Sequence, residues 1–571
     1  MQTYKEIHNE LQEAMMFQKR HLPLFLFPCI SLRNKGGEIM KRKFAAKFLA
    51  VLMTAAFVLT GCGSDASSTA TEGTAQATEG AESTDAASGG VVTLARNLDS
   101  GNLDPVMPAD NCDIWVLNMM VEGLVTSSDD GQEIIPAVAD SWTVSENELT
   151  YTFHLRDGIK FSNGDDVTID DCIYSLTRAK DADGPWLGML DMIDTMEDGG
   201  DNNLVITLKE PSPMFLSTLA MFSSGIMEKS YCEEVGEEGI AECPVGTGPF
   251  ILSEWDKGEK MVFTANPYYW EEGCPKVDEV DIVVVADDTT RIMQLESGQI
   301  DMASDIPYSR IDELKAAGNL TVNLFDSTDV KFVIINCQNE YLKDKKVRQA
   351  LELATDKDAI NAAVYFGYGE LAPTFLSPAA PHHNKNLTPV AHDAEAAKAL
   401  LAEAGYPDGF DLSIEVGSGD SAFLQIATIL QEEWAEIGVN LDIQQIDTAT
   451  ARANWKEGNY DVYISYMTSD MTDTSELAGL WTIADQTNCW RTYWDDEDQA
   501  KAEELCIKAN TEMDEDARMA DYGEMQEVVA DATPLIPLVY TPYTFVTTDK
   551  VTGYAQTPLG IYNFKYMTKS N

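Results

Sequence analysis

FLQIATILQEEWAEIGVNLDIQQI, residues 423–446, is the stretch that decides the fold class. Its apolar residues recur every three or four positions as far as Ile437, which predicts an amphipathic helix with one buried face. Gly438 ends that helix, and Val439 to Ile446 follows as a strand. A helix that leads directly into a strand indicates α/β architecture.

The same alternation of elements extends outward from this stretch. Tyr151–Leu155 alternates large apolar with polar side chains, as a half-buried strand does. Thr168 and Asp171 form a capping-box pattern that opens a helix through about Ala179. Residues 394–404 give another amphipathic helix. Since 571 residues exceed what one hydrophobic core supports, we predict an α/β fold of at least two lobes.

The charge balance is strongly acidic. The chain has 39 Lys and Arg against 95 Asp and Glu, a formal net charge of −56. Such a chain repels a polyanion, so nucleic acid is excluded as a partner, and an acidic, soluble, exported surface is expected. Eight cysteines lie beyond residue 62 without metal-type spacing, so buried thiols are the expectation. A disulfide bond between Cys232 and Cys243 is an alternative that stays open.

A leader begins at Met40. Basic residues precede the apolar run Phe48–Leu59, which is too short to span a bilayer and indicates a signal peptide over residues 40–61. The run ends in Leu-Thr-Gly-Cys, which resembles the lipobox of bacterial lipoproteins. That resemblance implies that Cys62 carries the lipid that anchors the mature chain to a membrane.

Two segments flank the leader. Residues 1–39 do not fit a signal peptide, so we expect them to be an upstream extension that precedes a translation start at Met40. Residues 62–90 contain no apolar residue larger than Ala after Cys62, so they are predicted to be a lipidated, disordered tether.

The sequence lacks the motifs of an enzyme. It has no nucleophile elbow, no zinc-protease helix and no phosphate loop. The loop that starts at Asp181 lacks the acidic twelfth residue of a calcium site. His382 and His383 stand alone in a Pro-flanked loop, where a solvated pair is expected. We therefore predict no catalytic residue, no metal and no cofactor.

Several segments together resemble the solute-binding proteins of peptide-type ABC importers, the oligopeptide- and dipeptide-binding family. They occur in the family's order from about residue 91 to the C-terminus: Leu103–Pro105, Glu122–Val125, Pro136–Trp142, Tyr151–Gly164, Gly246–Phe250, Asn266–Trp270, Val347–Leu351 and Ala404–Phe410.

The resemblance implies a two-lobed fold like that of periplasmic binding proteins, with the ligand cleft between the lobes. Lobe I would be residues 91–285 and 540–571, and lobe II residues 286–539. The hinge strands would lie near Val280–Val285 and Leu535–Phe545.

The resemblance also implies a function. The protein would be a monomer on the extracytoplasmic face of a bacterial membrane, held by its lipid. It would capture short peptides and deliver them to ABC permease subunits. Relatives in the family also bind nickel chelates, haem or oligosaccharides, and a peptide-sensing receptor would share the scaffold, so these alternatives stay open.

The candidate ligand site is carried by Tyr460–Asp470. This segment resembles the family segment that enters the cleft and ends in an Asp that holds the α-ammonium group of the peptide. The candidate ligand-binding residues are Asp470, Met467, Tyr466, Asn111 and Trp490. Ile464 stands where oligopeptide binders place an Arg that can meet the peptide carboxylate, so recognition of the peptide C-terminus stays open.

Overall fold

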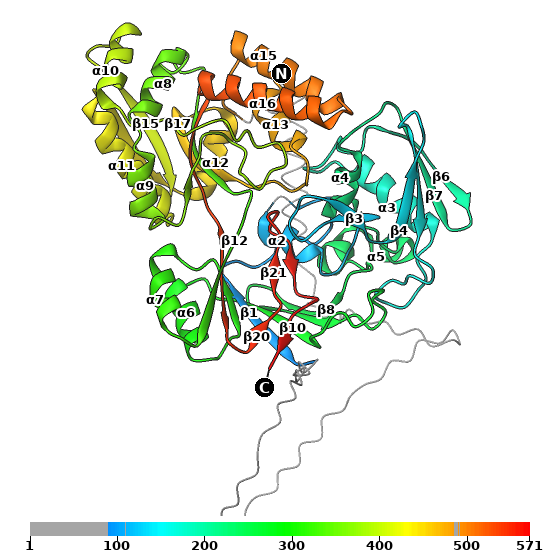
Figure 1. Cartoon of the computed structure of the whole chain (residues 1–571). Coiled ribbons are helices and arrows are strands. Elements are labelled where there is room, and N and C mark those ends of the chain that lie inside the picture. Colours follow the sequence, from blue (N-terminus) through cyan, green and yellow to red (C-terminus); the bar gives the residue numbers. More distant parts are fainter. Residues whose placement is uncertain (1–88, 109, 485–488, 490, 571) are drawn as a thin grey trace, which may run out of the picture. The chain divides into compact units, whose positions relative to one another are not determined.

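Alternating helices and strands build two lobes, each around its own sheet (Figure 1). The computed structural model describes residues 89–570 except 109, 485–488 and 490. Both lobes belong to one compact unit. The predicted leader, the tether and Cys62 lie outside the described residues.

Lobe I is built on a mixed sheet in which β1 is central. β1 runs parallel to β10 on one side and to β11 on the other, and the remaining strands join antiparallel. Seven described strands take the order β12-β19-β11-β1-β10-β9-β8. Their bounds are β1 Val91–Arg96, β8 Phe250–Asp256, β9 Lys260–Ala265, β10 Glu279–Val284, β11 Met302–Ser304, β12 Leu320–Phe325 and β19 Tyr543–Thr548.

A second, antiparallel sheet extends lobe I and has its own core. Phe153, Leu155 and Phe161 are buried there against α3. The order is β4-β5-β7-β6. The strands are β4 Ala139–Val144, β5 Thr150–Leu155, β6 Ile193–Gly200 and β7 Asn203–Leu208. Two-stranded pairs complete the lobe: β2 Val125–Ser127 with β3 Ile134–Pro136, β20 Val551–Thr552 with β23 Thr568–Lys569, and β21 Ala555–Gln556 with β22 Tyr562–Asn563.

The helices of lobe I are mostly short. They are α2 Asn111–Leu117, α3 Ile169–Asp181, α4 Phe215–Ala220, α5 Lys229–Glu242, α6 Asp288–Glu296 and α7 Ile311–Ala316, with 3-10 turns at Phe222–Ser224 and Tyr308–Arg310. The predicted capping box is confirmed: Thr168 caps α3 and Asp171 bonds back to the Thr168 backbone.

Lobe II holds one sheet with a continuous core between residues 330 and 540. The strand order is β14-β18-β13-β17-β15-β16. Its strands are β13 Val330–Ile335, β14 Glu370–Leu371, β15 Phe410–Gly417, β16 Val439–Ile446, β17 Val462–Met467 and β18 Leu535–Tyr540. Its helices are α8 Lys345–Leu353, α9 Lys357–Val364, α10 Ala394–Glu403, α11 Ser421–Glu436, α12 Thr448–Glu457, α13 Ser475–Thr482, α15 Glu497–Thr511 and α16 Glu515–Ala532.

The chain passes between the lobes at 326–329 and at 541–542 (Figure 1). The second crossing lies within the predicted hinge at Leu535–Phe545. The first corrects the predicted boundary, because β11 and β12 pair with lobe I strands and residues 286–325 therefore belong to lobe I. Val280–Val285 is apolar because β10 is an interior strand between β1 and β9, not because it is a hinge.

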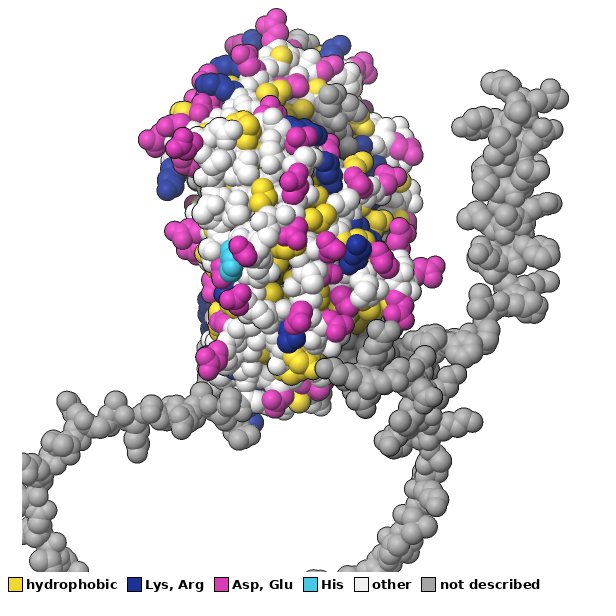
Figure 2. Space-filling model, turned by 90° about the vertical axis from the view of Figure 1, so that its right-hand side faces the viewer, with side chains coloured by type: hydrophobic (Ala, Val, Ile, Leu, Met, Phe, Trp, Pro, Cys, Tyr) yellow, Lys and Arg dark blue, Asp and Glu magenta, His cyan; other side chains and the backbone are white. Residues whose placement is uncertain are grey.

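The surface in Figure 2 carries Asp and Glu side chains over much of its extent, as the composition leads one to expect. No helix in the described part of the chain is long and apolar enough to cross a bilayer. The eight cysteines beyond residue 62 are thiols, Cys232 and Cys243 included.

Candidate ligand-binding site

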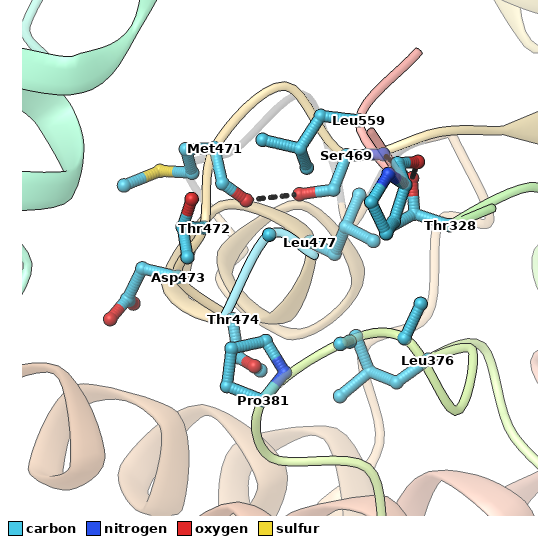
Figure 3. Close-up of a pocket in the computed structure, with 14 residues that line it drawn as sticks. Thr328, Leu376, Pro381, Ser469, Met471, Thr472, Asp473, Thr474, Leu477 and Leu559 are labelled. Atoms are coloured by element: carbon cyan, nitrogen blue, oxygen red, sulfur yellow. Dashed lines mark hydrogen bonds between the residues drawn. The ribbon is translucent and has the colours of Figure 1, made fainter. Parts of the chain in front are cut away.

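Asp470 lies in the loop that joins β17 to α13. The loop lies against the first crossing, because the backbone N–H of Ser469 donates a hydrogen bond to Thr328 Oγ1 at 2.8 Å. Glu476, in the first turn of α13, accepts a hydrogen bond from the backbone N–H of Asp470 at 2.9 Å. Ser469 Oγ lies 2.9 Å from Met471 O, the contact dashed in Figure 3, and 3.0 Å from Glu476 Oε2. These bonds hold the Asp470 backbone in a fixed position.

The Asp470 side chain, by contrast, has one carboxylate oxygen that accepts no hydrogen bond from the described residues. Its Oδ1 is shielded from solvent and has no hydrogen-bond partner among the residues described. Burial, and then the charge of Glu476, raise the pKa of Asp470 well above its usual value. Burial likewise raises the pKa of Glu476 to about 7. The site is therefore a buried carboxyl pair that an added cation would stabilise.

Lobe I contacts this loop at two points. Asn111 Nδ2 donates to Thr468 Oγ1 at 3.4 Å, and Ser127 Oγ lies 2.5 Å from Thr472 Oγ1. Asp470 thus lies between two contacts that join the lobes. Such a position lets lobe closure exclude water from the carboxylate.

A second charged group lies where the first crossing enters lobe II. Asp329 precedes β13, and its Oδ2 accepts a hydrogen bond from Lys331 Nζ at 2.7 Å. Lys331 Nζ also lies 4.2 Å from the ring centroid of Tyr466, its cross-strand partner on β17. Tyr466 is 49% exposed. The surroundings of its hydroxyl nevertheless raise the pKa of Tyr466 to about 12, first through partial burial and then through the negative charges of Asp329 and Asp305.

Two buried tyrosines, Tyr543 and Tyr365, lie near enough to Asp329 for its charge to raise their pKa. Tyr543 starts β19 at the second crossing and is buried; burial and the charges of Asp329 and Asp470 raise its pKa. The hydroxyl of Tyr365 is also buried, without a hydrogen-bond partner in the described structure. An acidic site lined by aromatic rings suits a ligand that carries a positive charge, because ring faces attract cations.

A narrow pocket lies at the loop that carries Asp470, although Asp470 itself does not line it. It is lined by Thr328 of the first crossing, by Leu376, Pro381, Ser469 and residues 471–474 of lobe II, and by Leu559 of lobe I (Figure 3). It has room for about one water molecule. The pocket marks the seam between the lobes rather than a chamber that holds a ligand.

Asp473 has a structural partner. Both of its carboxylate oxygens accept hydrogen bonds from Arg518 of α16 at 2.8 Å, and the pair is buried. Arg518 lowers the pKa of Asp473 even though burial alone would raise it. The neighbouring His382 corrects the expected solvated pair: it is 2% exposed and its ring nitrogens lie 2.9 Å from Thr474 Oγ1 and 3.0 Å from Glu515 Oε1.

Of the five predicted ligand-binding residues, Asn111 contacts Thr468 across the seam, while Tyr466 and Asp470 lie on either side of Thr468 along the chain. Met467 packs against the lobe II core, and Trp490 lies outside the described residues.

Sequence reasoning missed Glu476, Asp329, Lys331 and Tyr543. For Asp329 and Lys331, the available signal was an acid and a base two residues apart at the start of an apolar strand.

Comparisons with known proteins show which family the chain resembles. Residues 133–489 match the bacterial extracellular solute-binding proteins, family 5, middle region. The chain is 28% identical over 472 residues to heme-binding protein A of Haemophilus influenzae, which covers 78% of this chain and 85% of that protein. It is 27% identical over 494 residues to the dipeptide-binding protein of Escherichia coli, covering 80% and 89%.

A solved structure supports the fold over nearly the same extent. The periplasmic binding protein DppA from Helicobacter pylori, in complex with the peptide STSA, superposes with a TM-score of 0.76 at 26% identity. The match covers 85% of this chain and 99% of that one. This chain therefore belongs to family 5 of the bacterial extracellular solute-binding proteins, which bind solutes for ABC-type import and are not enzymes.

Proposed function

We propose that this protein captures short peptides between its lobes and holds the peptide α-ammonium group on Asp470. The observation that carries the proposal is the buried Asp470 Oδ1, which no hydrogen-bond donor among the described residues meets. A buried ion is unfavourable unless it is paired, so the carboxylate favours a cationic ligand group. The E. coli and H. pylori relatives are a dipeptide-binding protein and a protein solved with a peptide.

Asp470→Asn tests the proposal, because it keeps the side-chain shape and removes the charge. A charged hydrogen bond is worth about 1.5–3 kcal/mol, and a buried ion pair that loses one partner costs about 3–5 kcal/mol. Peptide affinity should fall by about tenfold to thousandfold in calorimetry. Acetylating the peptide amino group should cost a similar amount, and the two losses should not add, since both remove one contact.

Asp281→Asn is the matched control. Asp281 lies on β10 in lobe I and also has a buried carboxylate oxygen without a partner in the described structure. Its substitution should leave peptide affinity unchanged. If Asp470→Asn binds free and acetylated peptides as the wild type does, the ammonium assignment is wrong.

The membrane role belongs to the same proposal. We infer that the chain is anchored through a lipid on Cys62 and delivers its peptide to ABC permease subunits on the extracytoplasmic face. The lipobox-like Leu59–Cys62 supports this, and so does the family's role in import. Cys62→Ser should release the protein from the membrane fraction into the medium or periplasm. Membrane retention of that variant, with no lipid mass on wild-type protein, would contradict the anchor.

A further inference from the structure

Lys331 is a cation placed beside an aromatic ring and an incompletely paired acid. Its ammonium group has three N–H donors, and its one hydrogen bond within the described chain goes to Asp329 Oδ2 at 2.7 Å. A second side of the ammonium faces the Tyr466 ring at 4.2 Å. The Lys331 and Asp329 side chains are only 15% and 12% exposed. A lysine so far withdrawn from water retains donor capacity for one more acceptor.

The partner carboxylate shows the same incomplete pairing. Asp329 Oδ1 is buried and meets no donor in the part of the chain that the structure describes. An isolated structural ion pair would be expected to satisfy both members, because orphaned buried polar atoms are few in native proteins. Asp329 and Lys331 therefore both retain the capacity for a hydrogen bond to a group outside the described chain.

The spacing from Asp470 suits a short, doubly charged ligand. Lys331 lies opposite Tyr466, and Asp470 follows Tyr466 by four residues. Since four residues span at most about 14 Å even when fully extended, the backbone of Tyr466, opposite Lys331, lies no farther than that from the backbone of Asp470. Side chains that lean toward each other shorten this span. Tyr543 is near enough to both Asp329 and Asp470 for their charges to raise its pKa.

We propose that Lys331 receives the free carboxylate of the peptide whose ammonium group binds Asp470, while Asp329 Oδ1 accepts a backbone N–H of the same ligand. This inference rests on the proposed function and deepens it. An extended peptide advances at most about 3.3–3.6 Å per residue, so a span of this size takes ligands of about two to four residues with both termini free. Longer or C-terminally blocked peptides bind poorly.

The test uses the mature protein and two equimolar random mixtures of di- and tripeptides, one with free C-termini and one with C-terminal amides. Native mass spectrometry reads the fraction of protein bound. Wild type should prefer the free acids by about tenfold to hundredfold, the range for one charge-assisted hydrogen bond. Lys331→Met should bind both mixtures alike, and Lys331→Arg should keep the preference.

Two further variants keep the result interpretable. Lys331→Met with Asp329→Asn avoids leaving an uncompensated buried carboxylate and should also lose the preference. Lys257→Met is the matched control, because Lys257 likewise lies over an aromatic ring, Trp255, and beside an acid, Glu242, but on the β8–β9 turn of lobe I. It should behave as the wild type.

The outcomes separate this inference from the proposed function. If the wild type binds acids and amides equally while Asp470→Asn weakens both, the Lys331 assignment is wrong and the ammonium anchor stands. If the wild type binds neither mixture, both proposals fall. A preference for acids that persists in the double variant would also overturn the role of Lys331.

Discussion

At the scale of single residues, the site is defined by charges that the protein does not neutralise by itself. Asp470 and Glu476 are half-buried acids, and the backbone N–H of Asp470 donates a hydrogen bond to Glu476. Two such neighbouring carboxyl groups favour the retention of one proton, since the second ionisation adds a like charge at low dielectric. A ligand ammonium group reverses this preference.

Peptide binding should therefore release a proton near neutral pH. The pKa of Glu476 is raised to about 7 in the protein alone, and a bound ammonium would lower it. The complex then carries fewer protons, so affinity should rise as pH increases from about 5.5 to 8. Calorimetry in phosphate and in Tris should give different apparent enthalpies that reveal this proton. Glu476→Gln should flatten the pH dependence; an unchanged slope would contradict the carboxyl-pair origin.

The sequence predicted Asp470 because its neighbours match a known segment without a gap. It could not predict Glu476 or Lys331 as part of the site, because neither is marked by a motif. Their role arises from strand register, which places Lys331 opposite Tyr466, and from the turn that brings α13 back onto the Asp470 backbone. The expectation of a solvated His382 was wrong because packing against α16 buries it.

At the scale of elements, the loop that presents Asp470 is fastened at its far end by Asp473 and Arg518. Asp473→Ala would leave the Arg518 guanidinium buried without its bidentate partner. Removing one member of a buried pair costs about 3–5 kcal/mol. Urea denaturation should show a lower free energy of unfolding, and peptide affinity should fall as well because the loop loosens. Unchanged stability would contradict a structural role for the pair.

Two glycines in the turn after α10 offer a matched test of packing between elements. Gly409 has φ +74°, and a Cβ there would lie 1.8 Å from Gly438 O at the turn before β16. Gly405 has φ +95°, but its Cβ would meet open space. Gly405→Ala should cost about 1–2 kcal/mol of backbone strain. Gly409→Ala should cost clearly more in thermal unfolding, and equal losses would contradict the close approach.

Elements with a clear period were predicted well, whereas the first crossing, at 326–329, was not. β16 has the expected bounds, and α11 starts two residues earlier than the first apolar residue of its pattern. Val280–Val285 was taken for a hinge because interior parallel strands and buried connections are both apolar. Only the pairing of this segment with β1 and β9 distinguishes an interior strand from a hinge, and strand pairing cannot be predicted from the local sequence.

At the scale of the whole molecule, contacts across the seam favour a closed arrangement. Asn111 reaches Thr468, Ser127 reaches Thr472, and Arg452 Nη1 lies 3.7 Å from Asp110 Oδ1 at the exposed rim. The lobes are joined at the two crossings, so they can close as rigid bodies around a ligand. The protein would first be freed of ligand by unfolding and refolding. Small-angle scattering should then show compaction when a peptide known to bind is added. Identical profiles, with binding proven by calorimetry, would contradict hinge closure.

The most direct measurement of peptide capture is native mass spectrometry of the mature protein against a mixed panel. The panel contains random di-, tri- and pentapeptides, a nickel–histidine chelate, haem and an oligosaccharide. We expect the wild type to retain di- and tripeptides with free amino groups and to lose them on Asp470→Asn. Retention of the chelate, haem or oligosaccharide with no peptide bound would contradict the proposal that this cleft is built for peptides.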